Sequence, residues 1–184
     1  MDKEKNCIGG AVLNRIRLVL PTADHETQIK EYINEHISNG EQELHGGALI
    51  EKMPYTKWLK QIKANANEAT VNPEWVVSST FFAMTNEKII GMIDIRHLLN
   101  QMLREYGGHI GFGVRPSERS KGFATEILME GLKHCNTIGL HEIMLACYKE
   151  NAASSKTILK CGGVFEKEFL YADGKIVQVY WIKI

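Results

Sequence analysis

The stretch that decides the fold is residues 111–125, which read Gly-Phe-Gly-Val-Arg-Pro-Ser-Glu-Arg-Ser-Lys-Gly-Phe-Ala-Thr. An apolar strand leads into a polar, glycine-bearing turn, and the turn opens a helix over residues 122–134. Such a turn leaves several backbone N–H groups unpaired and pointing one way, and the helix dipole adds positive potential there. The stretch therefore predicts a cradle for a phosphate or pyrophosphate, to which Arg119 and Lys121 add formal charge.

This turn differs from two common nucleotide-binding loops. It lacks the second early glycine of G-x-G-x-x-G, and it does not end in the G-K-[ST] of a P-loop. It resembles instead the acyl-CoA turn of the GCN5-related N-acetyltransferases (GNAT superfamily), whose pattern is [QR]-x-x-G-x-[GA]. Arg119, Gly122 and Ala124 occupy its three defined positions. For this turn alone, a plain strand-turn-helix connection is the alternative interpretation.

A second motif follows in the order that this superfamily shows. Residues 142–148 predict a buried strand, Asn151 is suited to N-cap the next helix, and Gly162 or Gly163 to end it. GNAT proteins have a second hallmark, in which a strand is followed by N-x-x-[AS], a short helix and a glycine. Asn151 and Ser154 occupy the two defined positions of N-x-x-[AS] here. Residues 97–124 also resemble a bacterial subgroup of predicted acetyltransferases of unassigned substrate, through H-x-L-N at 97–100 and G-G-H-I-G-[FY]-G at 107–113.

The composition predicts a cytoplasmic protein. The resemblance implies a single GNAT domain over residues 1–184, with residues 1–13 as a loosely ordered leader. Lysine plus arginine and aspartate plus glutamate both number 22, so no global field favours nucleic acid or an anionic membrane. No apolar run reaches the roughly 18 residues of a membrane span. The four cysteines, at 7, 135, 147 and 161, lack metal-ligand spacing. They predict free thiols in a reducing compartment and no bound metal.

Hydrophobic periodicity and turn residues set the order of elements. Strands are predicted at residues 15–20, 80–84, 89–95, 109–114, 142–148, 164–170 and 175–184. Helices are predicted at residues 23–38, 55–69, 122–134 and 151–161. The resemblance implies that they form the α+β GNAT fold, with a central mixed, mostly antiparallel sheet, a splayed parallel pair and helices on both faces. Residues 97–108 form an insertion that predicts a short helix packed on the sheet.

The resemblance also implies which residues bind acetyl-CoA as co-substrate. In this superfamily the two motif-bearing strands splay apart and the pantetheine arm enters the gap. Backbone groups of Phe112, Gly113 and Val114 would pair with the pantetheine amides. The pyrophosphate would lie on the backbone N–H groups of the turn, which are those of Arg119, Ser120, Lys121, Gly122, Phe123 and Ala124. Asn151 and Ser154 would line the opposite side of the gap.

A general base is harder to assign. An alkylamine with a pKa near ~10.4 is almost fully protonated at pH 7, so a base is useful. The positions that often supply it in this superfamily are Gly108 and Ile110 here, and neither accepts a proton. His109 lies between them, faces the other way and is predicted to be structural. His97 is therefore the candidate base, with Asn100 placed to hold its ring. The alternative interpretation is that His97 is a surface or helix-capping histidine.

The general acid is displaced as well. The tyrosine that protonates the departing thiolate in many relatives corresponds to Ile158 here. Tyr148 is the candidate to replace it as the general acid, and Ser154 is another nearby hydroxyl. The alternative interpretation of Tyr148 is an aromatic residue of the core.

Two classes of function follow from the sequence. The first is an N-acetyltransferase that moves an acetyl group from acetyl-CoA to a primary amine of a small molecule or peptide, by direct attack in a ternary complex. The alternative is a CoA-binding sensor or interaction module with little or no turnover, because the usual acid and base are missing. The sequence does not specify the acceptor. The exposed edge strands expected in the C-terminal hairpin suggest a homodimer.

Overall fold

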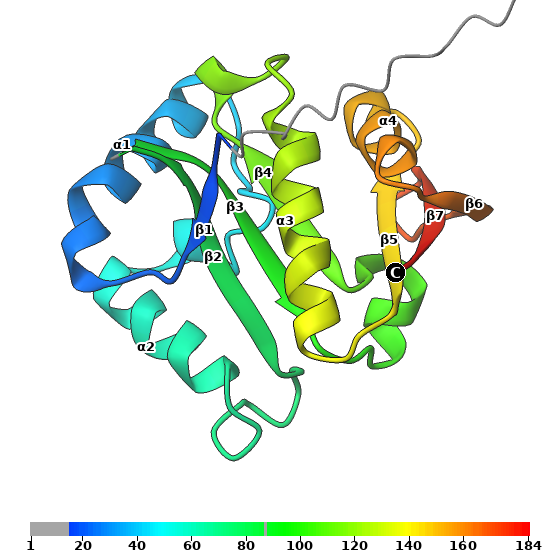
Figure 1. Cartoon of the computed structure of the whole chain (residues 1–184), viewed down its shortest axis with the longest axis horizontal. Coiled ribbons are helices and arrows are strands. Elements are labelled where there is room, and N and C mark those ends of the chain that lie inside the picture. Colours follow the sequence, from blue (N-terminus) through cyan, green and yellow to red (C-terminus); the bar gives the residue numbers. More distant parts are fainter. Residues whose placement is uncertain (1–14, 87) are drawn as a thin grey trace, which may run out of the picture.

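The computed structural model describes residues 15–86 and 88–184, and the predicted leader with its Cys7 lies outside them. The fold has two antiparallel sheets with helices around them (Figure 1). The first has the order β1 (Arg17–Val19), β2 (Ser78–Thr85), β3 (Lys88–Arg96), β4 (Ile110–Val114). The second has the order β5 (Glu142–Tyr148), β7 (Ile176–Lys183), β6 (Val164–Leu170). The helices are α1 (Glu26–Ser38), α2 (Tyr55–Asn65), α3 (Phe123–Thr137) and α4 (Ala152–Lys160). The predicted α+β GNAT fold is confirmed.

A β-bulge gives the first sheet two apolar faces. The register between β2 and β3 slips by one residue at Ile90, which leaves that residue without an opposite partner. As a result, Ile89 and Met92 pack with α1 and α2, whereas Ile90 and Ile93 pack with α3. Helices therefore cover both faces of this sheet, as the pattern predicted.

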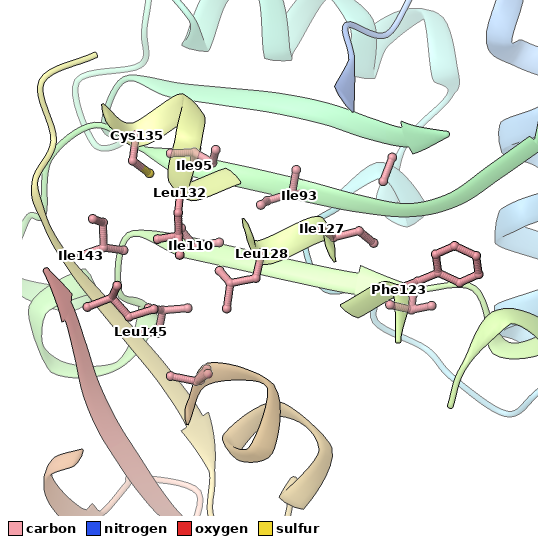
Figure 2. Close-up of a cluster of buried hydrophobic side chains, with 14 of the residues drawn as sticks. Ile93, Ile95, Ile110, Phe123, Ile127, Leu128, Leu132, Cys135, Ile143 and Leu145 are labelled. Atoms are coloured by element: carbon pink, nitrogen blue, oxygen red, sulfur yellow. The ribbon is translucent and has the colours of Figure 1, made fainter. Parts of the chain in front are cut away.

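The core on the α3 side joins the two sheets. Figure 2 shows its side chains converging from four elements. They are Ile93 and Ile95 of β3, Ile110 of β4, Ile127, Leu128 and Leu132 of α3, and Ile143 and Leu145 of β5. Because α3 follows directly after the polar turn, this burial fixes where the turn lies relative to both sheets.

The two sheets meet at His109 and Met144. The backbone N–H of His109 donates to the Met144 carbonyl at 2.7 Å, and the Met144 N–H donates to Nδ1 of His109 at 2.9 Å. From this point, residues 110–112 of β4 and 145–148 of β5 line one cavity, so the strands run in the same direction as they separate. This is the predicted splayed pair. The strands are thus split between two antiparallel sheets, and where the sheets meet the imidazole of His109 accepts the Met144 N–H.

The insertion at residues 97–108 packs on the second sheet as predicted. Leu99 and Leu103 are buried against Met144 of β5 and Val179 of β7. The short helical segment η3 (Leu103–Gly107) follows, with the Leu103 N–H donating to Oδ1 of Asn100 at 3.0 Å. The insertion thus brings polar and aromatic side chains to the edge of the gap between β4 and β5.

The C-terminal hairpin turns at Gly174, which has a left-handed φ of 82°. It pairs β6 with β7 and leaves β6 as the outer strand of the second sheet. Cys135, Cys147 and Cys161 carry free thiols. No helix within the described ranges is long and apolar enough to cross a bilayer.

Candidate active site

A cavity of about 600 Å³ lies where β4 and β5 separate. One wall is the edge of β4 that faces away from β3, at residues 110–112, and the opposite wall is β5 at residues 145–148. The start of α4 contributes Asn151, Ser154 and Ile158. The loop at residues 43–52 and the insertion close the remaining sides. The cavity therefore collects residues from both sequence motifs.

The loop wall depends on a glycine that lies directly on the sheet. Gly46 has a φ of 76°, and a Cβ there would lie 2.6 Å from the Met92 carbonyl oxygen and 2.8 Å from the Phe112 Cα. Only glycine fits this approach. Trp58 of α2 holds the loop in place, because its Nε1–H donates to the Gly47 carbonyl at 2.9 Å.

The turn before α3 presents free backbone donors. Ser120 and Gly122 both have left-handed backbones, with φ of 62° and 87°. Within residues 15–86 and 88–184, no group accepts a hydrogen bond from the successive N–H groups of Ser120, Lys121, Gly122, Phe123 and Ala124. The Arg119 N–H, in contrast, donates to the Pro116 carbonyl at 3.2 Å. An array of free N–H groups at the start of a long helix is suited to an anion.

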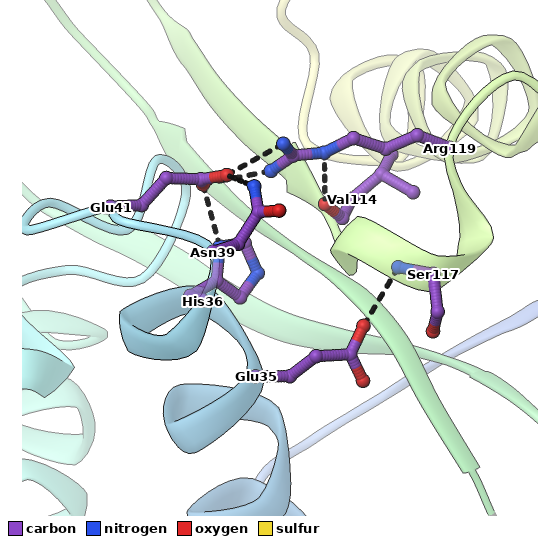
Figure 3. A network of polar contacts seen from close by, with 7 residues as sticks. All are labelled: Glu35, His36, Asn39, Glu41, Val114, Ser117 and Arg119. Atoms are coloured by element: carbon purple, nitrogen blue, oxygen red, sulfur yellow. Dashed lines mark hydrogen bonds and ion pairs between the residues drawn. The ribbon is translucent and has the colours of Figure 1, made fainter.

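The charged side chains of the turn are paired with carboxylates. Nη1 and Nη2 of Arg119 donate to the carboxylate of Glu41 at 2.6 and 2.8 Å, and Nε donates to the Val114 carbonyl at 3.1 Å (Figure 3). Lys121 pairs with Glu118 at 2.9 Å. Both cations are therefore held by carboxylates in this structure, and their contribution to a phosphate cradle stays a prediction.

Helix α1 anchors the turn from the other side. The Ser117 N–H donates to Oε1 of Glu35 at 2.7 Å, while His36 Nδ1 lies 2.8 Å from Oε2 of Glu41 (Figure 3). The hydrogen bonds from Arg119 are the main reason that the pKa of Glu41 falls to about 2. Burial lowers the pKa of His36. We call Glu41 and Arg119, with the Arg119–Val114 hydrogen bond, the turn clamp.

The predicted pantetheine-side residues lie on the two sides of the gap. Phe112 lies on the free edge of β4, and Gly113 and Val114 follow it along the strand. Across the cavity, Oδ1 of Asn151 accepts from the Ser154 N–H at 3.0 Å, which confirms Asn151 as the N-cap of α4. The structure thus brings Phe112, Asn151 and Ser154 to one cavity.

The predicted pairing of His97 with Asn100 is wrong. Nε2 of His97 lies 2.8 Å from the Ser79 hydroxyl, and burial lowers the histidine pKa. His97 is not among the cavity-lining residues. Asn100 does line the cavity, but its Oδ1 caps the insertion helix, so it does not hold the His97 ring. Helix capping outcompeted the expected contact, since Asn100 lies three residues before a free helical N–H.

Tyr148 lines the cavity, but its hydroxyl proton is donated to a carboxylate. Its hydroxyl donates to Oδ2 of Asp173 at 2.8 Å and accepts from the Tyr106 hydroxyl at 2.9 Å. Burial, followed by these two contacts, raises the Tyr148 pKa well above its ordinary value. The geometry does not favour the predicted acid role, because the Tyr148 proton points to a carboxylate.

Comparison with known proteins places this geometry in a family. Residues 15–164 match the model of the acetyltransferase (GNAT) domain. The chain belongs to the GNAT acetyltransferase family. It is an acetyl-CoA-dependent acetyltransferase. Among curated protein sequences, none matches the chain.

Solved GNAT structures share the fold at low sequence identity. The microcin C7 self-immunity acetyltransferase MccE, in complex with acetyl-CoA and AMP, has 18% identity and a TM-score of 0.67, with 92% of this chain and 93% of that chain covered. A putative ribosomal-protein-serine acetyltransferase from Vibrio cholerae has 19% identity and a TM-score of 0.65, covering 92% and 94%. RimJ of Mycobacterium smegmatis, with CoA disulfide, has 19% identity and a TM-score of 0.70, covering 91% and 81%.

The loop side of this GNAT cavity is acidic. Carboxylates outnumber cations among its lining residues, with Glu43, Glu51, Glu74 and Asp94 against Lys52 and Arg96. Asp94 is buried, accepts from the Thr80 hydroxyl at 2.8 Å and lies 3.4 Å from Nε of Arg96. None of these residues was singled out from the sequence, because they come from separate loops and strands. Within the described ranges, no cluster of three or more His, Cys, Asp or Glu is placed to hold a metal.

Proposed function

We propose that this GNAT protein transfers the acetyl group of acetyl-CoA to a primary amine of a small molecule or peptide, by direct attack in a ternary complex. The observation that carries the proposal is the run of free N–H groups at residues 120–124, which follows β4, the strand that lines the cavity with residues 110–112. The turn would hold the pyrophosphate, and the cavity would hold the thioester and the acceptor together. Placing both reactants in one cavity makes a covalent enzyme intermediate unnecessary.

The cofactor contacts follow from this placement. The N–H groups from Ser120 to Ala124 would donate to the pyrophosphate, while Arg119 acts through the turn clamp. Backbone groups of Phe112 and the N–H of Val114, on the free edge of β4, would pair with the pantetheine amides, while Gly113 between them faces β3. Asn151 and Ser154 would lie on the opposite side of the arm.

The acidic loop side of the cavity supports a cationic acceptor. Carboxylates attract a protonated amine and disfavour anionic substrates. The V. cholerae relative is described as acting on a ribosomal-protein serine. An α-amine has a pKa near about 8, against about 10.4 for an alkylamine, so far more of it is neutral at pH 7. An α-amine acceptor would therefore reduce the need for a strong base in a site that lacks one at Gly108 and Ile110.

One observation favours the alternative of a CoA-binding module with little turnover. His97 lies outside the cavity wall, and the Tyr148 proton is directed to Asp173. Release of free CoA thiol separates the two functions. Acetyl-CoA should be consumed faster with an N-terminal serine peptide or with 1,4-diaminobutane than without amine, and an equal rate would leave only the binding function.

The cofactor assignment has its own test. Acetyl-CoA should raise the melting temperature of the wild type, since it binds the folded state selectively. Gly122→Glu should abolish that shift, because it adds a negative charge where the phosphates would lie. Gly139→Glu is the matched control, since Gly139 also has a positive φ, of 76°, but lies beyond the other end of α3 in open space. A wild-type shift in Gly122→Glu would disprove the cradle.

A further inference from the structure

A chain of three side chains connects the cavity to the protein surface. The Tyr106 hydroxyl donates to the Tyr148 hydroxyl at 2.9 Å, and the Tyr148 hydroxyl donates to Oδ2 of Asp173 at 2.8 Å. Tyr106 and Tyr148 line the cavity. Asp173 lies exposed in the turn between β6 and β7. The three residues come from the insertion, from β5 and from the C-terminal hairpin.

The donor direction along this chain is fixed by chemistry. An ionised carboxylate only accepts hydrogen bonds, so Tyr148 donates its single proton to Asp173. The contact between the two tyrosines then has Tyr106 as its donor. Every O–H along the chain therefore points from the cavity towards solvent. The Tyr106 oxygen keeps lone pairs that can accept a proton from inside the cavity.

Neighbouring groups hold the chain in this geometry. The Tyr106 ring stacks on Tyr171, with centroids 4.3 Å apart and planes 15° apart. Lys175 places Nζ 5.0 Å from the Tyr148 ring centroid, and its backbone N–H donates to Oδ1 of Asp173 at 3.0 Å. Lys175 and Tyr171 are thus the charged and titratable neighbours that face the chain from the β6–β7 hairpin.

We propose that Tyr106, Tyr148 and Asp173 form a proton relay that removes the proton of the attacking amine from the cavity. This inference rests on the proposed function. Tyr106 is the member that contacts the acceptor, and Tyr148 and Asp173 act through it.

Proton transfer along the relay accompanies the transfer of the acetyl group. The neutral amine attacks the thioester carbon, so an N–C bond forms, the π pair of the C=O bond moves to the carbonyl oxygen, and the nitrogen becomes positive. That nitrogen gives one proton to the Tyr106 oxygen while the Tyr106 proton moves to Tyr148 and the Tyr148 proton moves to Asp173. Both phenols stay neutral. The oxyanion then re-forms the C=O bond as the C–S bond breaks with its electron pair on the CoA sulfur. The sulfur takes a proton from solvent, and Asp173 releases its proton to water.

The exposed end of the relay suits proton release. The hydrogen bond from the Lys175 N–H is the main reason that the pKa of Asp173 lies below its ordinary value. Asp173 is therefore ionised throughout the neutral range and passes any proton it receives to water. The same outward direction argues against donation from Tyr148 to the thiolate, which would need the chain reversed.

Two variants test the relay, with acetyl-CoA and the N-terminal serine peptide or 1,4-diaminobutane as probes. Tyr106→Phe keeps the stacked ring but removes the entry hydroxyl, and kcat should fall at least about tenfold at pH 7, with a smaller loss at pH 9. Asp173→Asn keeps an oxygen acceptor for Tyr148 but loses the charge, and should lower kcat in the same pH-dependent way. KM for acetyl-CoA should stay unchanged in both.

Tyr171→Phe is the matched control, because it removes a hydroxyl from the same aromatic cluster but not from the chain, and its pH profile should match the wild type. A wild-type kcat and pH profile in Tyr106→Phe and Asp173→Asn would overturn the relay. Asp173 is exposed, so Asp173→Asn decides the question if Tyr106→Phe fails to fold. Absence of amine-dependent turnover in the wild type would instead overturn the proposed function, and the relay with it.

Discussion

Glu41→Gln tests whether the turn clamp prepares the phosphate cradle. The substitution keeps the shape of the side chain but removes the negative charge that receives both terminal nitrogens of Arg119. Charge-assisted hydrogen bonds contribute about 1.5–3 kcal/mol. The side chains of Arg119 and Glu41 are 42% and 28% exposed, so solvent screens the pair. We therefore expect a loss of about 1–2 kcal/mol.

That loss should appear in two measurements. At about 2–4 °C per kcal/mol for a chain of this size, the melting temperature of Glu41→Gln should fall by about 2–8 °C. A looser turn also populates its binding conformation less, so the calorimetric Kd for acetyl-CoA should rise. The same free energy limits that rise to about 5–30-fold.

The pH dependence of the clamp has a definite sign. The Glu41 pKa is lowered from 4.5 to about 2, so its stabilisation is present above 4.5 and is lost as pH falls towards 2. The difference in Kd between Glu41→Gln and the wild type should thus be the same at pH 7.5 and pH 5.5. Glu31→Gln, at an exposed site on the preceding helix α1, is the control. If Glu41→Gln melts and binds acetyl-CoA as Glu31→Gln does, the clamp has no role in the cradle.

Two further outcomes follow from the histidines. His97→Ala should change kcat less than about threefold at both pH 7 and pH 9, because the ring lies outside the cavity wall; a loss confined to pH 7, measured by CoA thiol release, would restore His97 as the base. Burial lowers the His109 pKa from 6.5 to about 4, with smaller contributions from Arg104 and Arg96. The free energy of unfolding should therefore fall as the pH drops from 6.5 towards 4. In urea titrations, the drop in the free energy of unfolding between pH 7 and pH 4 should be about 3 kcal/mol smaller in His109→Asn than in the wild type. An equal drop in the two proteins would contradict the lowered His109 pKa.

The sequence predicted what is local and missed what is long-range. The phosphate turn, the Asn151 cap and the Gly174 hairpin turn each depend on a few neighbouring residues, so their residue types indicate them directly. Glu41 is different. It lies 78 positions from Arg119 and carries no motif, and only the packing of α1 beside the turn brings them together. The acidic loop side of the cavity is dispersed in the same way.

Lys121 and Asn100 are both held by partners close to them in the sequence. Each side chain was assigned to a ligand or a catalytic partner, and each is used by a nearer group in the folded protein. Lys121 finds Glu118 three residues away, and Asn100 finds the N–H of Leu103. A short-range partner costs less conformational entropy than a distant one, so it takes precedence unless the fold prevents it.

The cavity itself originates at one residue pair. The N–H of Met144 on β5 faces His109, the residue that precedes β4. Here the imidazole of His109 accepts it, while Gly108 with its φ of 64° allows a backbone approach in which a Cβ would lie 2.7 Å from the Met144 oxygen. The strands therefore touch once and then separate. Because a neutral His109 ring is needed as the acceptor, its protonation would remove the hydrogen bond from the Met144 N–H and leave the bond from the His109 N–H to the Met144 carbonyl as the polar contact of this pair.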